Sequence, residues 1–237
     1  MAREVIFKDL GLRDYKEAWD YQEELFGKMQ DVKTKNRILS PVDKEGQQNR
    51  LLFVEHPHVY TLGKSGSDNN LLVNQMQLKA KEASFYRINR GGDITYHGPG
   101  QIVGYPLLDL EEFGLTLKTY IHKVEEMIIL SLLEYGIESK RMEGATGVWI
   151  DSQDGHGKQA RKICAIGVRA SRFITMHGFA FNINTNLDYF NYINPCGYTD
   201  KGVTSLALEL GEKQDFEKAK LIVKNNFGRV FGINWKS

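Results

Sequence analysis

The stretch Arg90-Gly91-Gly92-Asp93-Ile94-Thr95-Tyr96-His97-Gly98-Pro99-Gly100-Gln101 is the most informative part of this sequence. It places four glycines and a proline around a histidine, between two apolar runs. Glycine is favoured where φ must be positive or where the backbone must approach another group closely, so the segment is predicted to lie against a ligand. A plain hairpin turn is the alternative, because Gly-Pro-Gly and Gly-Gly also occur in turns that bind nothing.

The glycine spacing does not match the common nucleotide-binding motifs. Gly98, Gly100 and Gly104 miss the dinucleotide fingerprint by one residue, and no strand-to-helix context follows them. Lys64-Ser65 follows Gly63, but the earlier glycine that a phosphate loop requires is missing. A ligand at the opening stretch is therefore expected to be something other than a nucleotide bound through these motifs.

Length and composition predict one globular domain over residues 1–237. The chain has 41% hydrophobic residues, enough for a substantial core, and shows no internal repeat or linker. No apolar run approaches the roughly 18 to 20 residues of a membrane span, and the first residues lack the apolar block of a secretory signal. We therefore expect a soluble cytoplasmic protein without a membrane partner.

The charge balance argues against nucleic acid as a partner. The formal net charge is +1, whereas a general nucleic-acid binder shows a basic excess over the whole domain. Positive residues do gather in one window without a carboxylate among them: Lys158, Arg161, Lys162, Arg169 and Arg172. This window is interpreted either as a surface for an acidic partner or as a solvated strand face.

Hydrophobic periodicity predicts an α/β (α+β) fold. Helical spacing predicts helices over Asp14–Gln30, Leu117–Tyr135 and Phe216–Phe231. Short β-type runs predict strands over Leu51–Val54, Val59–Leu62, Phe85–Ile88, Asp93–Tyr96, Ile102–Leu107, Gly147–Asp151, Ile163–Val168 and Gly178–Asn184. Because several strands follow one another without a helix between them, mixed and largely antiparallel sheets flanked by helices are expected.

The two cysteines differ in their surroundings. Cys164 lies in the apolar run Ile163–Ile166, where a cysteine behaves as a small buried hydrophobe. Cys196 follows a proline and precedes a glycine, which predicts a loop that can expose the thiol. Cys196 is therefore the candidate nucleophile, with simple packing as the alternative for any single cysteine.

A nucleophilic thiol needs an activating neighbour, and the candidates are His97, His177 and Lys162. For Lys162 the alternative is a solvated charge at a strand end. His56 and His58 alternate along the chain, but two histidines without a third ligand do not define a metal site, so no metal is expected.

Six segments, in order along the chain, resemble the lipoyl(octanoyl) transferases, a family similar in fold to lipoate and biotin protein ligases. They are Glu55–Gly63, the opening stretch Arg90–Gln101, Gly147–Trp149, Lys162–Gly167, His177–Asn182 and Asn194–Gly197. They are spread over most of the chain. The resemblance implies a fold of the biotin/lipoate protein ligase type.

The resemblance also implies roles for residues. It makes Cys196 the acyl-accepting nucleophile and Lys162 its general acid/base partner, with no cofactor and no metal. It implies an acyltransferase that moves an octanoyl group from octanoyl-acyl carrier protein to a lysine of lipoyl domains. The acceptors are those of 2-oxoacid dehydrogenase E2 subunits and of the glycine cleavage H protein. The implied substrate-binding residues are Arg90, Gly91, Gly92, Asp93, Ile94, Thr95, Tyr96, His97, Ala165, Ile166, Gly167, His177, Gly178, Phe179 and Ala180.

Two alternatives remain at this level. An ATP-dependent lipoate or biotin ligase would form an acyl-adenylate and need no cysteine nucleophile. A binding module would keep the fold and hold a lipoylated or acyl-carrier partner without turnover. One local departure from the family is the polar stretch 151–159, which is expected to be a solvated hairpin loop, with gating of the site as the other reading.

Overall fold

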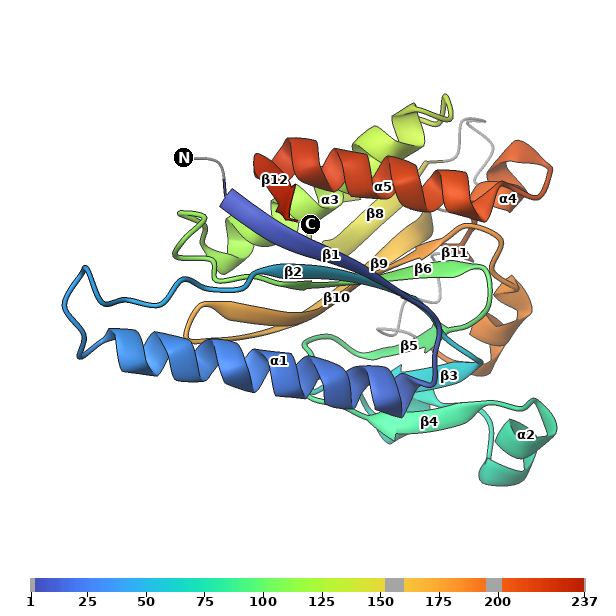
Figure 1. The fold of residues 1–237 in the computed structure, drawn as a ribbon. Coiled ribbons are helices and arrows are strands. Elements are labelled where there is room, and N and C mark those ends of the chain that lie inside the picture. The colour runs from blue at the N-terminus through green and yellow to red at the C-terminus, as the bar shows by residue number, and fades with distance from the viewer. Residues whose placement is uncertain (1–2, 152–159, 195–201, 237) are drawn as a thin grey trace.

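Two β-sheets organise the chain (Figure 1). The computed structural model describes residues 3–151, 160–194 and 202–236. The strands are β1 (Arg3–Leu12), β2 (Arg50–Glu55), β3 (Val59–Leu62), β4 (Ser84–Arg87), β5 (Ile94–His97), β6 (Gln101–Leu107), β7 (Lys140–Met142), β8 (Ala145–Ile150), β9 (Arg161–Ser171), β10 (Ile174–Asn182), β11 (Gly202–Val203) and β12 (Ile233–Lys236). The α-helices are α1 (Tyr15–Asn36), α2 (Gln75–Ala80), α3 (Leu117–Leu133), α4 (Leu206–Leu210) and α5 (Phe216–Phe231), and 3₁₀ helices form at η1 (Asp68–Asn70) and η2 (Leu187–Tyr192).

The larger sheet has the order β12-β1-β2-β6-β10-β9-β8-β7, with β11 beside β9, and the smaller sheet has the order β4-β3-β5. Neighbours from β2 to β7 are antiparallel, and so are β3 and β5. Parallel pairs join β1 to β12 and β2, β11 to β9, and β3 to β4. The prediction of mixed, largely antiparallel sheets flanked by helices is confirmed.

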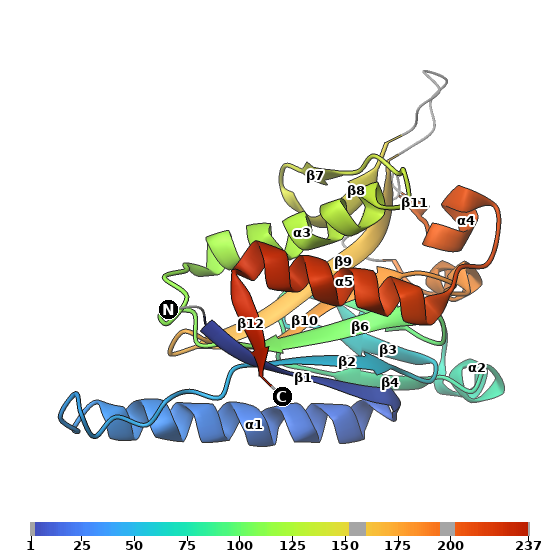
Figure 2. The same ribbon diagram turned by 45° about the horizontal axis from the view of Figure 1, so that its top comes forward.

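The helices cover both faces of the larger sheet. Helices α3 and α5 lie together on one face, while α1 runs along the other (Figures 1 and 2). The core between the sheet and α3/α5 contains Phe53, Val124 and Phe227, each with no exposed surface. A second core between the sheet and α1 contains Met29 and Leu52. The smaller sheet lies near the start of α1 (Figure 1).

The predicted helices form close to the expected bounds. Helix α5 spans Phe216–Phe231 as expected, with Asp215 capping its first turn. Helix α3 ends at Leu133, two residues before the expected end. Helix α1 continues six residues past Gln30 to Asn36, although its last turns are polar. Contacts from distant parts of the chain stabilise this extension, which helical periodicity does not reveal.

Two short connections change sheets and do not form hairpins. Strand β2 pairs with β1 and β6, whereas β3 pairs with β4 and β5. Likewise β5 belongs to the smaller sheet and β6 to the larger one, so residues 98–100 cross between them. The hairpin reading of the opening stretch is therefore wrong, because its two flanking strands do not pair with each other.

The two terminal strands lacked a strong pattern in the sequence. Strand β1 is mostly exposed, and of its residues only Val5 is buried. It pairs in parallel with β12, with Arg3 opposite Ile233. A partner more than two hundred residues away cannot be read from local periodicity, which explains why neither strand was expected. None of the helices in the described ranges is long and apolar enough to cross a membrane.

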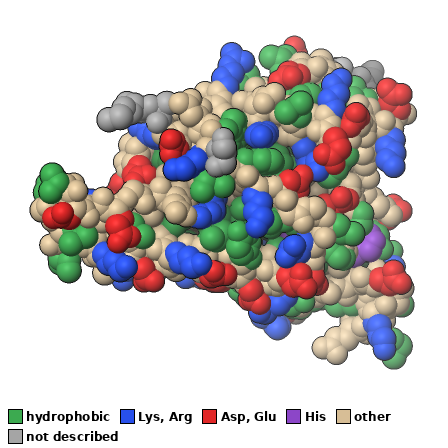
Figure 3. All heavy atoms as spheres, in the orientation of Figure 1, with side chains coloured by type: hydrophobic (Ala, Val, Ile, Leu, Met, Phe, Trp, Pro, Cys, Tyr) green, Lys and Arg blue, Asp and Glu red, His purple; other side chains and the backbone are tan. Residues whose placement is uncertain are grey.

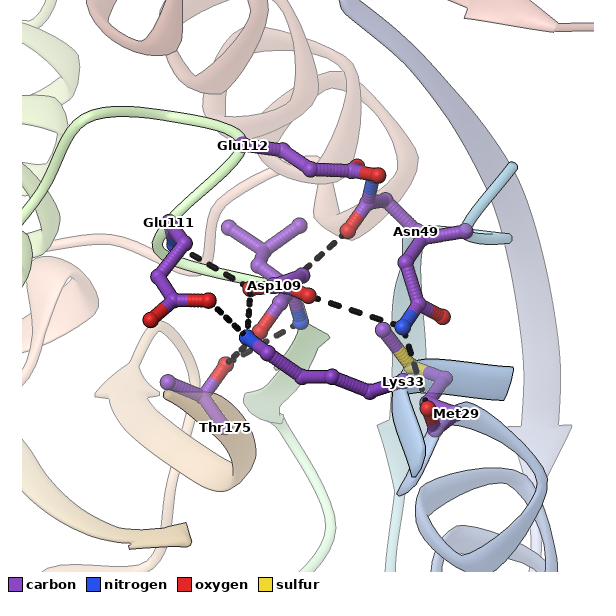
Figure 4. A network of polar contacts seen from close by, with 9 residues as sticks. Met29, Lys33, Asn49, Asp109, Glu111, Glu112 and Thr175 are labelled. Atoms are coloured by element: carbon purple, nitrogen blue, oxygen red, sulfur yellow. Dashed lines mark hydrogen bonds and ion pairs between the residues drawn. The ribbon is translucent and has the colours of Figure 1, made fainter. Parts of the chain in front are cut away.

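A buried polar network anchors the end of α1 (Figure 4). Lys33 Nζ lies 2.6 Å from Asp109 Oδ1 and 2.7 Å from Glu111 Oε2. The Asp109 backbone N–H donates to Asn49 Oδ1 at 2.8 Å. The Lys33 and Asp109 side chains are 12% and 5% exposed, so the pair is largely removed from water. The network ties α1 to the chain that leaves β6, on the side of the sheet opposite α3.

We expect Asp109→Ala to lower the free energy of unfolding by about 3 kcal/mol, because it leaves a buried ammonium with only the more exposed Glu111 as partner. Urea unfolding at neutral pH measures the change. Lys16→Ala is the matched control, since its pair with Asp20 is exposed and exposed pairs contribute little. Equal effects from the two substitutions would show that the buried network does not stabilise the fold.

Candidate active site

A cavity of about 290 Å³ lies between the two sheets. Its walls come from the opening stretch, from β6, β9 and β10, and from the turn that joins β7 to β8. Lys162 and most of the predicted substrate-binding residues line it: Arg90, Gly92, Asp93, Ile94, Thr95, His97, Ala165, Ile166, Gly167, His177, Gly178, Phe179 and Ala180. The fold thus brings together three segments that are far apart in the sequence.

The structure places Gly91 and Tyr96 outside the cavity wall. Gly91 donates its backbone N–H to Val168 O at 2.9 Å and so joins the opening stretch to β9. Tyr96 alternates with its neighbours along β5 and packs in the core of the smaller sheet. Its hydroxyl lies 2.7 Å from His58 Nδ1, and its ring stacks on Tyr189. Both residues support the wall from behind.

A chain of buried hydrogen bonds fixes the polar part of the wall. Arg90 Nη2 donates to Thr61 O at 2.7 Å and to Thr61 Oγ1 at 3.0 Å. Thr61 Oγ1 lies 3.4 Å from His97 Nε2, and His97 Nδ1 lies 2.9 Å from Gln101 Oε1. Gln101 Nε2 donates to Asn182 Oδ1 at 2.8 Å.

The donors in this chain define its proton positions. The Gln101 amide nitrogen faces the Asn182 oxygen, so the Gln101 oxygen faces His97 and accepts from Nδ1–H. Asn182 Nδ2 in turn donates to Thr204 O at 2.9 Å. These hydrogen bonds therefore run from Thr61 in the smaller sheet, through the opening stretch, to Asn182 at the end of β10 and on to Thr204.

The crossover at residues 98–100 depends on close backbone contact. Gly100 has φ +80°, and a Cβ there would lie 2.6 Å from the carbonyl carbon of Asn184. Its N–H donates to Glu55 Oε1 at 2.6 Å, and its carbonyl accepts from Asn184 N at 2.8 Å. Glycine is needed at position 100 because the backbone there is left-handed and packs against Asn184, just after the end of β10.

Three histidines near the cavity are held neutral by burial. Burial lowers the pKa of His56 to about 4, and it lowers the pKa of His97 to about 3, with a further contribution from His56. Burial, followed by the Arg90 and Arg169 charges, lowers the pKa of His177 to about 3. At neutral pH these side chains serve as hydrogen-bonding groups and carry no charge.

Lys162 lies near the start of β9, opposite Trp149 of β8. Its Nζ is 4.6 Å from the centroid of the Trp149 ring, which favours the ammonium form through a cation–π contact. Gly147 packs behind it with φ +125°, and a Cβ there would lie 2.5 Å from Cys164 O and 3.4 Å from Lys162 Cε. Lys162 is the second residue of β9, as the alternative of a lysine at a strand end requires, but it is partly buried and lines the cavity, so it is not a fully solvated charge.

A buried carboxylate holds this Gly147 backbone in place. Glu125 of α3 accepts the Gly147 N–H at 3.1 Å and pairs with Arg141 at 3.1 Å. The Trp149 indole N–H donates to Ala145 O at 2.9 Å. These bonds hold Gly147 and Trp149, the two residues of β8 that contact the Lys162 side chain.

The structure describes one of the two cysteines, Cys164. Cys164 is fully buried in the core, and burial raises the pKa of its thiol. This agrees with the packing role predicted for it. Cys196 lies outside the described residues, as do residues 152–159 of the polar loop. The described chain stops at Asn194 and resumes at Gly202, which pairs with Arg161 and lines the cavity.

His56 and His58 have structural partners. His56 Nδ1 donates to Arg13 O at 2.8 Å, and Tyr105 Oη lies 2.7 Å from its Nε2. The His58 ring stacks on Tyr189 with the centroids 4.0 Å apart. Among the described residues, no group of three or more His, Cys, Asp or Glu side chains is placed to hold a metal ion.

The basic window is partly neutralised. Arg161 makes two 3.0 Å hydrogen bonds to the Glu209 carboxylate. Arg169 Nη1 lies 2.9 Å from Glu23 Oε1. Figure 3 shows Lys and Arg side chains interspersed with Asp and Glu on the face viewed in Figure 1. These ion pairs weaken the hypothesis that the window forms one positive docking surface.

Several cavity residues were not among the predicted site residues. They are Tyr15, Gln101, Val103, Tyr105, Gly144, Ala145, Thr146, Trp149, Asn182, Phe190, Gly202 and Val203. Alternation along β6 would have indicated Val103 and Tyr105, which point the same way. Tyr15 comes from the first turn of α1, and only the tertiary structure brings it against the His97 ring, 5.9 Å away.

The two sheets, with a cavity between them, place the chain in the lipoate and biotin protein ligase fold class. A solved structure of an archaeal lipoylation system from Thermoplasma acidophilum, a bi-partite lipoate protein ligase and its E2 lipoyl domain, matches with a TM-score of 0.66 and 14% identity. The match covers 100% of this chain and 86% of that chain, and at this identity it concerns the fold alone.

The sequence comparisons define the family. The model of the lipoyl protein ligase A/B catalytic domain matches residues 14–228. A Flavobacterium johnsoniae protein named Octanoyltransferase is 58% identical over 98% of both chains. A Christiangramia forsetii protein of the same name is 54% identical over 100% of this chain and 99% of its own. The chain belongs to the lipoyl protein ligase A/B catalytic domain family, and the prediction of an acyltransferase is confirmed.

The buried neutral histidines predict how stability depends on pH. The pKa of folded His56 is about 4, below the ordinary value near 6.5, so the unfolded chain binds a proton first as the pH falls. Its contribution is fully present above pH 6.5 and is lost as the pH falls toward 4, by about 1 kcal/mol per pH unit. Urea unfolding from pH 7.5 to 4.5 should show a shallower slope for His56→Gln than for the unsubstituted chain. His122→Gln, at an exposed site on α3, is the control; an unchanged slope in His56→Gln would refute the linkage.

Proposed function

We propose that this protein transfers an octanoyl group from octanoyl-acyl carrier protein to a specific lysine of lipoyl domains. The acceptors are lipoyl domains of 2-oxoacid dehydrogenase E2 subunits and of the glycine cleavage H protein. The observation that carries the proposal is the cavity in which Lys162 and thirteen of the fifteen predicted substrate-binding residues meet. The near full-length similarity to proteins named Octanoyltransferase supports the same acyl group.

The cavity suits a medium acyl chain. Its volume of about 290 Å³ is near the lower end of the range for small-molecule sites. Ala165, Ile166, Phe179 and Ala180 supply apolar wall along β9 and β10. Burying about seven acyl carbons at roughly 0.8 kcal/mol each contributes on the order of 5 to 6 kcal/mol, which distinguishes a medium chain from shorter ones.

The first half-reaction uses Cys196 as nucleophile. The step needs Lys162 as the neutral amine, the form that desolvation in a closed cavity favours for a lysine. This amine takes the thiol proton, and the Cys196 thiolate attacks the carbonyl carbon of the octanoyl thioester. The tetrahedral intermediate collapses, the bond to the carrier sulfur breaks, and the Lys162 ammonium returns its proton to that sulfur. The Trp149 ring face favours the ammonium that exists between these two proton transfers. One thioester replaces another, so the free-energy change of this half-reaction is small.

The second half-reaction forms the amide. Lys162 takes a proton from the acceptor lysine as its amine attacks the Cys196 thioester, and the new C–N bond forms as the C–S bond breaks. The proton then passes from Lys162 to the Cys196 sulfur, which restores the enzyme. Aminolysis of a thioester is downhill, so the sequence of steps needs no ATP. The position of Lys162 inside the cavity supports this shared acid/base role.

Cys196 is close in sequence to Gly202 and Val203, which line the cavity. Val203 pairs with Lys162, and Gly202 with Arg161. Only five residues separate Cys196 from Gly202 along the chain. The segment that contains the candidate nucleophile therefore joins the described chain at a residue that pairs with β9 beside Lys162.

Incubation with octanoyl-acyl carrier protein should add one octanoyl group to the protein, removable by hydroxylamine, because a thioester forms at Cys196. Intact mass spectrometry with peptide mapping locates the group. Cys196→Ser should lack the hydroxylamine-sensitive adduct, whereas Cys164→Ala, at a buried thiol, should retain it. Finding the group on Cys164, or transfer only from free octanoate with ATP, would overturn the mechanism in favour of another site or of a ligase.

Lys162→Ala should slow formation of the Cys196 adduct by at least 100-fold at neutral pH, since general acid/base groups contribute roughly 10²- to 10⁴-fold. Single-turnover kinetics with octanoyl-acyl carrier protein measures the rate. Lys140→Ala is a control for loss of a lysine, because Lys140 pairs with Asp151 at an exposed position on β7. An adduct that forms in Lys162→Ala at the original rate would remove the lysine from the mechanism.

A further inference from the structure

A β-bulge in β9 turns Lys162 toward the cavity. Val148 pairs with Cys164 and Trp149 with Lys162, so Ile163 is an extra residue with no partner of its own on β8. In a regular strand, Lys162 would share the side of Cys164, which is buried in the core on the α3 side of the sheet. The bulge places Lys162 on the opposite side, where it lines the cavity.

Beyond Lys162, alanines of two adjacent strands form the floor of the cavity. Ala165 of β9 pairs with Ala180 of β10, and Ala180 pairs with Val103 of β6. Residues directly opposite each other point to the same side of a sheet, and Ala180 and Val103 pack together on the α1 side. All three residues line the cavity. The floor next to Lys162 therefore carries only two methyl groups before the bulkier Val103.

The aliphatic part of the Arg90 side chain covers Gly167, the residue of β9 that follows Ala165 on the cavity side. A Cβ at Gly167 would lie 2.9 Å from Arg90 Cδ and 3.0 Å from Gly91 O. The guanidinium is held in place, because Arg90 Nη2 donates to Thr61 O at 2.7 Å and to Thr61 Oγ1 at 3.0 Å. Arg90 is 7% exposed, so its side chain forms a fixed wall across this part of the cavity.

Strand geometry gives the distances from Lys162 along β9. Ala165 and Gly167 are three and five residues further on, roughly 10 and 16 Å at about 3.3 Å per residue. An extended octanoyl chain is roughly 9 Å long, at about 1.2 Å per bond as in the extended backbone. Its methyl end therefore reaches Ala165 when the thioester lies beside Lys162. Contact with Arg90 takes about 4 Å of the longer distance, so a dodecanoyl chain of roughly 13 Å does not fit.

We propose that Ala165 and Ala180 determine the acyl length that this cavity accepts, by leaving room for the last carbons of an octanoyl chain in front of Arg90. This inference rests on the proposed function, which puts the thioester beside Lys162. A side chain larger than alanine at either position occupies the space of those carbons and leaves room only for a shorter chain. The Arg90 side chain stops a longer chain, whose extra carbons stay outside the cavity and in contact with water.

Three pantetheine thioesters test the assignment: hexanoyl, octanoyl and dodecanoyl. Binding is measured by calorimetry in a Cys196→Ala background, so that no acyl transfer occurs. We expect octanoyl to bind about tenfold more tightly than hexanoyl, because two further methylenes are buried, and dodecanoyl to bind no more tightly than octanoyl. With Ala165→Val in the same background, octanoyl and hexanoyl should bind within about twofold of each other, because the valine takes the space of the last carbons.

Ala170→Val is the matched control, because Ala170 is exposed on the same strand and does not line the cavity, and it should keep the difference between octanoyl and hexanoyl. If Ala165→Val does not fold, Ala180→Val serves instead, since it fills the same space from β10. Equal binding of octanoyl and hexanoyl in the background protein, tighter binding of dodecanoyl than of octanoyl, or a difference that Ala165→Val leaves unchanged overturns the proposal. The expected binding pattern without octanoyl transfer by the unsubstituted protein would overturn the proposed function alone.

Discussion

The hydrogen-bond chain from Arg90 through Thr61, His97 and Gln101 to Asn182 is the constraint on which the site depends. Two sheets that share no backbone pairing would otherwise be free to collapse onto the space between them. Each member of the chain is buried, so breaking one link leaves a polar group without a partner in a low-dielectric region, which costs more than the bond itself contributes. The chain therefore fixes both the separation of the sheets and the orientation of the polar wall.

The sequence predicted the elements of the fold better than their arrangement. Apolar runs located the central strands, and helical spacing gave α5 at its observed bounds, because burial within one element is a local pattern. The assignment of strands to sheets was not local. Residues 98–100 look like a hairpin turn in the sequence, but the contact of Gly100 with Glu55 and Asn184 makes them a crossing between sheets. The polar end of α1 is helical because Lys33 reaches Asp109.

The same distinction applies to the candidate site. Segments singled out by their glycines and by family resemblance do line one cavity, and Lys162 lies within it. Which residues of these segments face the cavity was not predicted correctly throughout: Gly91 and Tyr96 belong to the predicted segments but support the wall from behind. His177 Nε2 lies 2.7 Å from Asn89 Oδ1, and Asn89 Nδ2 donates to Glu23 Oε1 at 2.8 Å, so the ring of this cavity residue is held by residues from the loop after β4 and from α1. Contacts of this kind, made behind the residues that line the cavity, leave no pattern in the sequence, because each involves one residue from a separate element.

The pairing of the two chain ends affects how the molecule is made. Strand β1 is synthesised long before β12, yet one of its edges is completed only by β12, since Arg3 lies opposite Ile233. Until β12 has been synthesised, β1 presents unpaired backbone groups along one side, the kind of edge that can recruit another chain. Its exposed charged side chains, such as Glu4 and Lys8, oppose that association. A sequence separation this long also raises the contact order and slows folding, so pairing of β1 with β12 is expected to be a late step.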